Sequence, residues 1–470
     1  MVRLVTWTPT HTLPLTAETW STPALAPDRI VSADRAGVVR AFTATGEIAW
    51  EVRMGHEITA SPTLADLPDP TVLIGDHGGT FVALDLATGA ERWRQSFGAM
   101  IRATAAVAPV EGALAIVLPV YGPRIVRMTA SGSVVFDRSL PKHEVYQCGR
   151  DAGAVSSPLL ADVDGDGRDE IVFGVRAHRV YCCDAATGDL RWFTPLRYDP
   201  DSSPTLALSD QEPILLIGGG EHTGGTGDNA LVALAPGSGR VRWTAPAGGG
   251  VDGAATVAEV GGEPLAFYCS LASGSVIATD LSGAERWRVP FGPTDACVHD
   301  PLCRPPDRPY FTGRAICRSY ATPLVADLDG DGRQQVVAGS NNGTLLVLDA
   351  ETGAVRARIR TGGMARGSAV LADIRGEGTC DLVVPSGDRL LVFATEAPAP
   401  EAWSQMKGEP RHLGWRSPRA IPPRDVRAPR GMASRLFWYS VPRDAARFVA
   451  FQVERRVLRP LGIRLAEHYY

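Results

Sequence analysis

The chain has 470 residues, enough for one very large domain or two to three ordinary ones. Its 50 glycines and 36 prolines indicate many short elements joined by turns. No apolar run approaches the roughly 18 residues of a membrane span, and the first residues lack the apolar segment and cleavage site of a signal peptide. We therefore expect a cytoplasmic protein without a membrane span.

The formal net charge of −5 is unevenly distributed along the chain. From Trp403 to Tyr470 there are 14 Lys and Arg but 5 Asp and Glu, so this end is basic and the remainder is acidic. An acidic body disfavours nucleic acid as a partner. The basic end is interpreted as a solvated surface, with a partner or the acidic body itself as alternative contacts.

An internal repeat runs from about residue 20 to 405. Each unit has an alternating apolar run, a turn glycine and, in most units, an aromatic residue four positions after it, as in FVALDLATGAERW at 81–93. The unit is about 43 residues long, with insertions in three units. The turn glycines are Gly46, Gly89, Gly132, Gly188, Gly239, Gly283 and Gly353, and the aromatic residues are Trp50, Trp93, Phe136, Trp192, Trp243 and Trp287.

Each unit contains four strand signals, which in one unit cover 59–66, 70–75, 80–86 and 91–95. A four-stranded unit of this length, repeated four to eight times, is typical of a β-propeller blade. Seven units and an eighth that ends near Trp403 predict an all-β, eight-bladed propeller. We expect residues 2–7 to pair into the last blade and close the ring, which removes a free sheet edge.

The repeat resembles the quinoprotein-like (PQQ-like repeat) propeller family, whose blade motif is AxDxxTGxxxW. The best matches are Asp85, Thr88, Gly89 and Trp93, and Asp184, Thr187, Gly188 and Trp192. The family includes quinone-dependent dehydrogenases and assembly scaffolds, and its motif residues are structural, so the resemblance implies a fold and no activity. Cys182–Cys183 is similar to a cysteine pair over the quinone in some members. Here the pair lies in a predicted strand, so we interpret it as packing and expect no quinone cofactor.

Two acidic loops predict structural calcium sites. Asp162, Asp164 and Asp166 alternate on a glycine-rich turn, followed by the backbone carbonyl of Arg168 and the carboxylate of Glu170. Alternating oxygen ligands suit Ca²⁺. A second copy has the ligand set Asp327, Asp329, Asp331, Arg333 and Gln335. Both copies resemble the calcium loops of FG-GAP and integrin-type propellers, and a catalytic Ca²⁺ is the weaker alternative.

A third copy of the loop is degraded. Asp373, Glu377 and Asp381 are present, but Arg375 replaces the second acid. Arg375 could supply the positive charge itself. The three loops are expected to share one face of the propeller with the turn glycines.

Six histidines map to the loops of the opposite face. Histidine is the commonest transition-metal ligand, so these side chains form a candidate site, although polar loops also expose histidine without any function. Two insertions, 141–153 and 295–317, add cysteines to this face. Those insertions could hold a transition metal (Cu, Fe or Zn) or a disulfide, and a loop-stabilising role is favoured over catalysis. The histidines are His56, His77, His143, His178, His222 and His299, and the cysteines are Cys148, Cys297, Cys303 and Cys317.

The repeat alignment also predicts a ring of innermost-strand residues around a central funnel. Arginine and aspartate in such a ring either pair with each other or bind a charged ligand. Arg102 and Arg366 suit a carboxylate or phosphate. The ring consists of Trp20, Thr59, Arg102, Val155, Asp201, Asp252, Tyr320 and Arg366. The candidate catalytic residues are His56, His77, His178, His222, Arg102, Arg366, Asp201, Asp252 and Tyr320.

Three segments are expected: a propeller over 1–405, a Pro/Arg-rich linker over 406–439, and an amphipathic helical tail over 440–470 that could contact a protein partner. Two functions stay open. The first is a metal-dependent biosynthetic (tailoring) enzyme acting on a small polar or peptide substrate in the funnel. The second is a non-catalytic scaffold that binds a protein or glycan. Converging histidine rings would favour the enzyme and scattered ones the scaffold.

Overall fold

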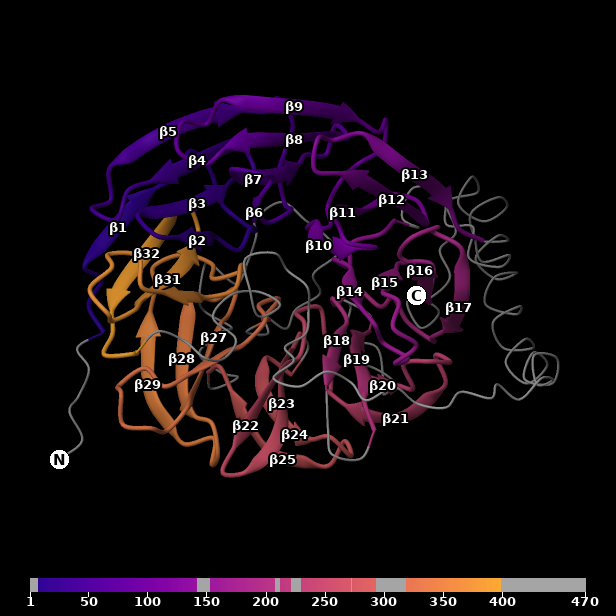
Figure 1. Cartoon of the computed structure of the whole chain (residues 1–470). Coiled ribbons are helices and arrows are strands. Elements are labelled where there is room, and N and C mark those ends of the chain that lie inside the picture. The colour runs from indigo at the N-terminus through magenta and orange to yellow at the C-terminus, as the bar shows by residue number, and fades with distance from the viewer. Residues whose placement is uncertain are drawn as a thin grey trace, which may run out of the picture.

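The computed structural model describes residues 7–141, 153–207, 212–220, 230–271, 273–292 and 318–398. These residues form eight four-stranded antiparallel sheets, arranged as the blades of a propeller around a central axis (Figure 1). The predicted all-β, eight-bladed fold is therefore confirmed. The expected linker and helical tail lie outside the described residues. Within those residues, no helix has the length and apolar character needed to cross a bilayer.

The strands follow one another from the inside of each blade to its outside. Blades 1 to 4 comprise β2 (Ala24–Ala26), β3 (Arg29–Ala33), β4 (Val38–Phe42) and β5 (Ile48–Arg53); β6 (Thr63–Asp66), β7 (Pro70–Gly75), β8 (Thr80–Asp85) and β9 (Glu91–Ser96); β10 (Ala106–Val110), β11 (Ala113–Val120), β12 (Arg124–Thr129) and β13 (Val134–Ser139); and β14 (Leu159–Ala161), β15 (Glu170–Val175), β16 (Arg179–Asp184) and β17 (Leu190–Pro195).

Blades 5 to 8 comprise β18 (Thr205–Ala207), β19 (Ile214–Gly219), β20 (Ala230–Leu234) and β21 (Val241–Pro246); β22 (Thr256–Val260), β23 (Glu263–Ser270), β24 (Ser275–Asp280) and β25 (Glu285–Pro290); β26 (Leu324–Ala326), β27 (Gln335–Gly339), β28 (Thr344–Asp349) and β29 (Val355–Arg360); and β30 (Val370–Ala372), β31 (Asp381–Ser386), β32 (Arg389–Ala394) and β1 (His11–Pro14).

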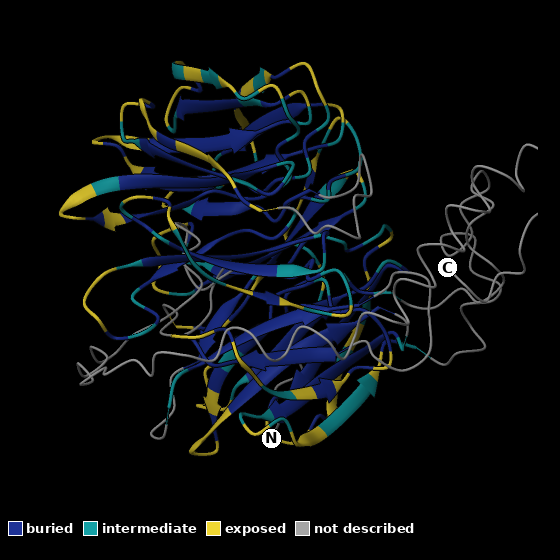
Figure 2. Cartoon of the chain, turned by 90° about the vertical axis from the view of Figure 1, so that its right-hand side faces the viewer, coloured by how far each residue is buried: buried dark blue, intermediate teal, exposed yellow. Residues whose placement is uncertain are grey.

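The middle strands of the blades are almost wholly buried, and the outermost strands alternate between buried and exposed positions. Figure 2 shows this arrangement, with buried strands inside the ring and exposed residues concentrated in turns and outer edges. A strand covered on both faces reads as a continuous apolar run, whereas a half-covered strand alternates. This difference explains why the apolar runs of the sequence mark the middle strands.

The N-terminal segment closes the ring, as predicted, but through different residues. β1 pairs with β32 in the register His11↔Val392 to Pro14↔Arg389. The predicted segment was 2–7, so the closing strand begins several residues later. Of that segment only Trp7 is described, and its ring packs edge-to-face on Phe393 with 6.0 Å between centroids. The outer strand of blade 8 thus comes from the start of the chain.

The glycine and tryptophan of the repeat join neighbouring blades. Trp50 of blade 1 donates its indole N–H to Leu86 O of blade 2 at 2.9 Å, and its ring covers Gly89. A Cβ on Gly89 would lie 2.7 Å from the indole, and its φ of +73° also favours glycine. The same indole bond recurs from Trp93 to Ala130, Trp192 to Pro236, Trp243 to Leu281 and Trp287 to Ala350.

A second device joins the blades near the axis. In seven of the eight blades, a serine or threonine near the start of the innermost strand accepts a hydrogen bond on its hydroxyl oxygen. The donor is the backbone N–H of the residue at the same position in the preceding blade. Ser368 N donates to Thr22 Oγ1 at 3.0 Å and so links blade 8 to blade 1. The series runs through Thr22, Ser61, Thr104, Ser157 and Ser203, and then through Ala254, Thr322 and Ser368. Ala254 has no hydroxyl, so the link from Ser203 to blade 6 is missing.

Candidate functional site

The two intact acidic loops connect the first and second strands of their blades. Carboxylate oxygens of Asp162, Asp164 and Asp166 lie within 4.8 Å of one another, and those of Asp327, Asp329 and Asp331 do the same. The loops are shaped by their own backbone: Gly167 N, for example, donates to Asp162 Oδ2 at 3.0 Å. Six acids are thereby gathered into two tight clusters without any need for distant parts of the chain.

The ninth position of each loop is buried beneath the cluster. Glu170 Oε2 accepts a hydrogen bond from Val163 N at 3.0 Å, and Gln335 Oε1 accepts one from Leu328 N at 2.7 Å. Gln335 Nε2 donates to Arg333 O at 2.8 Å, so this carbonyl is turned toward the loop. The donor set is therefore entirely oxygen, as a hard cation requires.

The electrostatics of these loops favour added positive charge. Burial, with neighbouring carboxylates, raises the pKa of Asp164 and of Asp329. Burial also raises the pKa of Glu170 to about 8. Arg191 partly offsets this in the first loop, where its Nη1 lies 3.0 Å from Asp166 and 3.1 Å from Glu170. Residue types, geometry and charge all fit Ca²⁺.

The degraded third loop carries its own cation. Arg375 Nε lies 3.0 Å from Asp381 Oδ2, and Arg375 Nη1 lies 2.8 Å from Glu377 Oε2. Asp373 accepts hydrogen bonds from the backbone N–H groups of Glu377 and Gly378, as the first acid of the other loops accepts them. The guanidinium therefore supplies the positive charge that the sequence suggested.

The predicted funnel ring is structurally equivalent in all eight blades. In each blade, a backbone N–H in the loop after the second strand donates a hydrogen bond. The acceptor is the carbonyl oxygen of the residue two positions before the ring residue. Examples are Arg35 N to Glu18 O at 3.1 Å and His77 N to Glu57 O at 2.9 Å. The donors form a second ring that the sequence reasoning missed: Arg35, His77, Tyr121, Arg176, Gly220, Leu271, Asn341 and Gly387.

Several charged groups of the two rings pair with each other. Arg176 makes a bidentate contact with Asp201, at 2.9 and 3.2 Å, and Asp201 is 9% exposed. Against the effect of burial, Asp201 raises the pKa of Arg176. Arg35 pairs with both Glu57 and Glu18. For these residues, the arginines and carboxylates pair with each other, which was one of the two alternatives that the sequence left open.

The histidines of this face also have near neighbours. His77 lies 2.8 Å from the Thr59 hydroxyl and 3.7 Å from Glu57, and burial lowers the pKa of His77. His178 Nε2 lies 3.5 Å from Asp199. His56 packs its ring near Gly78. These three histidines therefore contact different residues.

The remaining ring cations are arranged differently. The Arg366 guanidinium lies 3.4 Å from the centroid of the Trp20 ring and 3.9 Å from that of Tyr320. Arg102 has a buried Nε that makes no hydrogen bond to the described residues. Burial lowers the pKa of both guanidinium groups, and Asp252 acts in the opposite direction on each.

Potential metal ligands outside the acidic loops show no cluster in the described part of the chain. There, the groups of three or more candidate ligands are the two aspartate triads, and neither contains a histidine or cysteine. The other predicted ligands lie outside the described residues: His143, Cys148, His222, Cys297, His299, Cys303 and Cys317.

The adjacent cysteines Cys182 and Cys183 are both buried in β16 and carry free thiols. Their side chains belong to two different core clusters, on opposite faces of the sheet. Burial raises the pKa of Cys183 to about 12, so its thiol stays protonated near neutral pH. The arrangement is that of packing residues.

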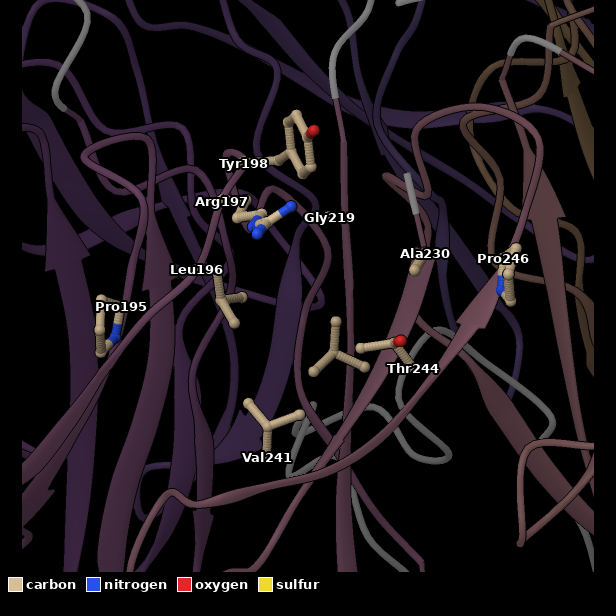
Figure 3. Close-up of a pocket in the computed structure, with 10 residues that line it drawn as sticks. Pro195, Leu196, Arg197, Tyr198, Gly219, Ala230, Val241, Thr244 and Pro246 are labelled. Carbon is tan, nitrogen blue, oxygen red and sulfur yellow. The ribbon is translucent and has the colours of Figure 1, made fainter. Parts of the chain in front are cut away.

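A cavity of about 330 Å³ lies beside blade 5 (Figure 3). Its walls are mainly apolar, with Leu196 and Val232 among them, and Arg197 and Tyr198 add polar groups. The cavity flanks the connection that leads to Asp199 and Asp201, but none of the predicted site residues lines it.

The fold is that of an eight-bladed propeller of the PQQ-like class, with acidic loops between first and second strands and two rings of equivalent residues. A family model described as "Outer membrane protein assembly factor BamB" matches residues 8–162 and 125–299, which together exceed half of the chain. The chain therefore belongs to this family. No curated protein matches the sequence.

Solved structures share the fold at low sequence identity. BamB from Moraxella catarrhalis is 18% identical with a TM-score of 0.55, over 82% of this chain and 96% of that one. Saccharomyces cerevisiae Sqt1 is 11% identical with a TM-score of 0.59, over 82% and 98%. A europium-containing methanol dehydrogenase is 12% identical with a TM-score of 0.58, over 81% and 85%. At these identities the likeness shows the fold alone.

Proposed function

We propose that this protein is a calcium-stabilised β-propeller that binds a small polar or peptide substrate in its central funnel. The observation that supports the proposal is the pair of rings at equivalent positions of the eight blades, which include Arg35, His77, Arg102, Arg176 and Arg366. Convergent polar groups in a concave site are the general mark of ligand recognition. The cytoplasm is the proposed location.

Calcium has a structural role in this proposal. The acidic triads of the loops in blades 4 and 7 each gather negative charge that a divalent cation neutralises. The all-oxygen donor sets of these loops support Ca²⁺ over a softer metal. The loops' resemblance to FG-GAP and integrin-type calcium loops points in the same direction.

The enzymatic part of the proposal is a biosynthetic tailoring reaction that uses a transition metal, Cu, Fe or Zn, on the side of the histidines. Elemental analysis of protein purified without added metal tests it. Stoichiometric copper, iron or zinc beside calcium supports the enzyme. Calcium alone, near two per chain, contradicts the metal-dependent reaction.

Substrate binding is tested by releasing small molecules that the purified protein retains from a cell extract and analysing them by mass spectrometry. We expect a small polar or peptidic compound from the wild type and its loss from Asp201→Ala, whose Arg176 then lacks its partner. Retention of the same compounds by both proteins would contradict binding in the funnel.

The second candidate is a scaffold that binds a protein or glycan and performs no reaction. The description of the matching family as an assembly factor favours it. A protein partner held through residues 440–470 is part of this candidate. Chemical crosslinking of the full chain distinguishes the two, since a partner linked to residues 440–470 but none near the funnel would favour the scaffold.

A further inference from the structure

The arginines of the funnel divide into two kinds. Arg35 and Arg176 each face carboxylates of the protein, at Glu18 and Glu57 and at Asp201. Arg102 and Arg366 form no ion pair or hydrogen bond with the described residues, although both are at ring positions. Both side chains are only partly exposed, so a guanidinium that lacks a carboxylate partner there favours an added anion.

Arg366 is held in place by aromatic rings. Its guanidinium lies 3.4 Å from the Trp20 centroid and 3.9 Å from the Tyr320 centroid, both within the range of cation–π attraction. Arg35 contacts the same Trp20 ring at 4.2 Å. Aromatic faces hold the plane of a guanidinium but accept no strong hydrogen bond from its N–H groups. Arg366 is thus oriented by the two rings, and no ion pair to a described carboxylate engages its N–H groups.

Arg102, at the equivalent ring position of blade 3, is the second cation of this kind. Its Nε is buried and lacks a hydrogen-bond partner among the described residues. Against the effect of burial, Asp252 raises the pKa of both Arg102 and Arg366, and the charge of Arg102 lowers the pKa of Arg366. Two guanidinium groups and one carboxylate leave a net positive charge on these three ring residues.

We propose that Arg102 and Arg366 form a subsite for an anionic group, a carboxylate or a phosphate, of the molecule that enters the funnel. Guanidinium binds either group through paired N–H donors, and partial burial strengthens the bond. This inference rests on the proposed function, because it names the chemistry of the substrate. The paired arginines Arg35 and Arg176 contribute walls of the funnel and no anion site.

The test uses thermal unfolding and calorimetric titration of the full chain with three probes: inorganic phosphate, N-acetylglycine and the uncharged N-acetylglycine amide. At constant ionic strength, we expect at least one anion to raise the melting temperature and the amide to have no effect. A phosphate-only effect assigns a phosphate subsite, and an N-acetylglycine effect assigns a carboxylate subsite. No effect from either anion overturns the proposal.

Variants locate the effect. Arg366→Met and Arg102→Met should each weaken binding of the active probe about tenfold to a hundredfold, because each removes a charge-assisted donor. Arg35→Met is the matched control: it also contacts Trp20 but has its own carboxylates, and its affinity should change less than threefold. Should Arg366→Met fail to fold, Arg366→Lys keeps the charge without the planar donor pair, and we expect a loss of about tenfold. Equal losses in Arg35→Met and Arg366→Met would overturn the proposal.

The experiments distinguish failure of the anion subsite from failure of the proposed substrate binding. A neutral compound retained by the wild type, together with no anion effect, overturns the anion subsite and leaves substrate binding intact. An anion effect that depends on Arg102 and Arg366, with no retained compound, supports the subsite and contradicts the proposed substrate function.

Discussion

The two faces of this propeller treat charge in different ways. At the acidic loops, residues close in sequence gather carboxylates into clusters, and the third loop shows the same frame neutralised by Arg375. At the funnel, residues from all eight blades converge, and some cations are paired while Arg102 and Arg366 are not. The loops form from residues close in sequence, whereas the rings form only once the eight blades have closed. A role in recognition therefore fits the funnel better than the loops.

Calcium removal should have the largest effect of all on stability and little on the funnel. At calcium a thousandfold above Kd, each site contributes about 4 kcal/mol to the free energy of unfolding. Chelation should lower the melting temperature strongly, and Asp162→Ala with Asp327→Ala should reproduce the loss and cancel the response to chelator. An unchanged melting temperature after chelation would contradict structural calcium.

The third loop should be independent of calcium. Arg375→Met leaves the buried Asp381 without its partner and should cost about 2–3 kcal/mol, reduced from a fully buried pair because Arg375 is partly exposed. Urea unfolding measures the change. The calcium content should be the same as in the wild type, and a gain or loss of one ion would refute an internal cation at this loop.

Contacts between blades should be sensitive near the rim. Gly283 has a φ of +88°, and a Cβ there would lie 2.8 Å from Trp243, so Gly283→Ala should cost about 2–4 kcal/mol. Gly122 has a φ of +91° with no atom within 4 Å of an added Cβ. Gly122→Ala should therefore show the backbone strain alone, about 1 kcal/mol. Equal costs in the two variants would show that Trp243 is not responsible.

The hydroxyl series near the axis allows one destabilising and one stabilising substitution. Thr104→Val removes the acceptor of the Ser61 N–H and should cost about 1–3 kcal/mol. Ala254→Ser supplies the hydroxyl that blade 6 lacks, which should stabilise by about 0.5–1.5 kcal/mol. Denaturant unfolding measures both, and destabilisation by Ala254→Ser would show that the position cannot accept a hydroxyl.

The smallest expected effect is a pH dependence at the funnel. Burial lowers the pKa of His77 below its ordinary 6.5, so the folded state binds fewer protons than the unfolded state. The contribution of neutral His77 is present above pH 6.5 and is lost as the pH falls through the folded pKa. His77→Gln should flatten this part of the stability profile. A profile that keeps the same slope in the variant would assign it to other groups.

The repeat register was enough to predict the blades and the equivalence of the eight ring positions, because strand alternation and turn glycines fix which residues correspond. It placed Arg102 and Arg366 at matching positions of blades 3 and 8. The contacts between blades could not be predicted from the sequence. Trp50 covers Gly89 of the next blade and Arg176 pairs with Asp201, and these contacts form only when the blades pack. The closing strand was displaced from 2–7 to His11–Pro14 because no repeat motif marks its start. Transition-metal ligands on the insertions, outside the described residues, stay a prediction.

One titration tests most directly whether the acidic loops only stabilise the fold while the ring arginines bind the anion. The affinity of the active anion is measured by calorimetry in the wild type and in Asp162→Ala with Asp327→Ala, at a temperature where both are folded. The account predicts the same affinity in both proteins, with a much lower melting temperature in the variant. Loss of anion binding in the folded variant, with an unchanged melting temperature, would contradict it by making the acidic loops part of the recognition site.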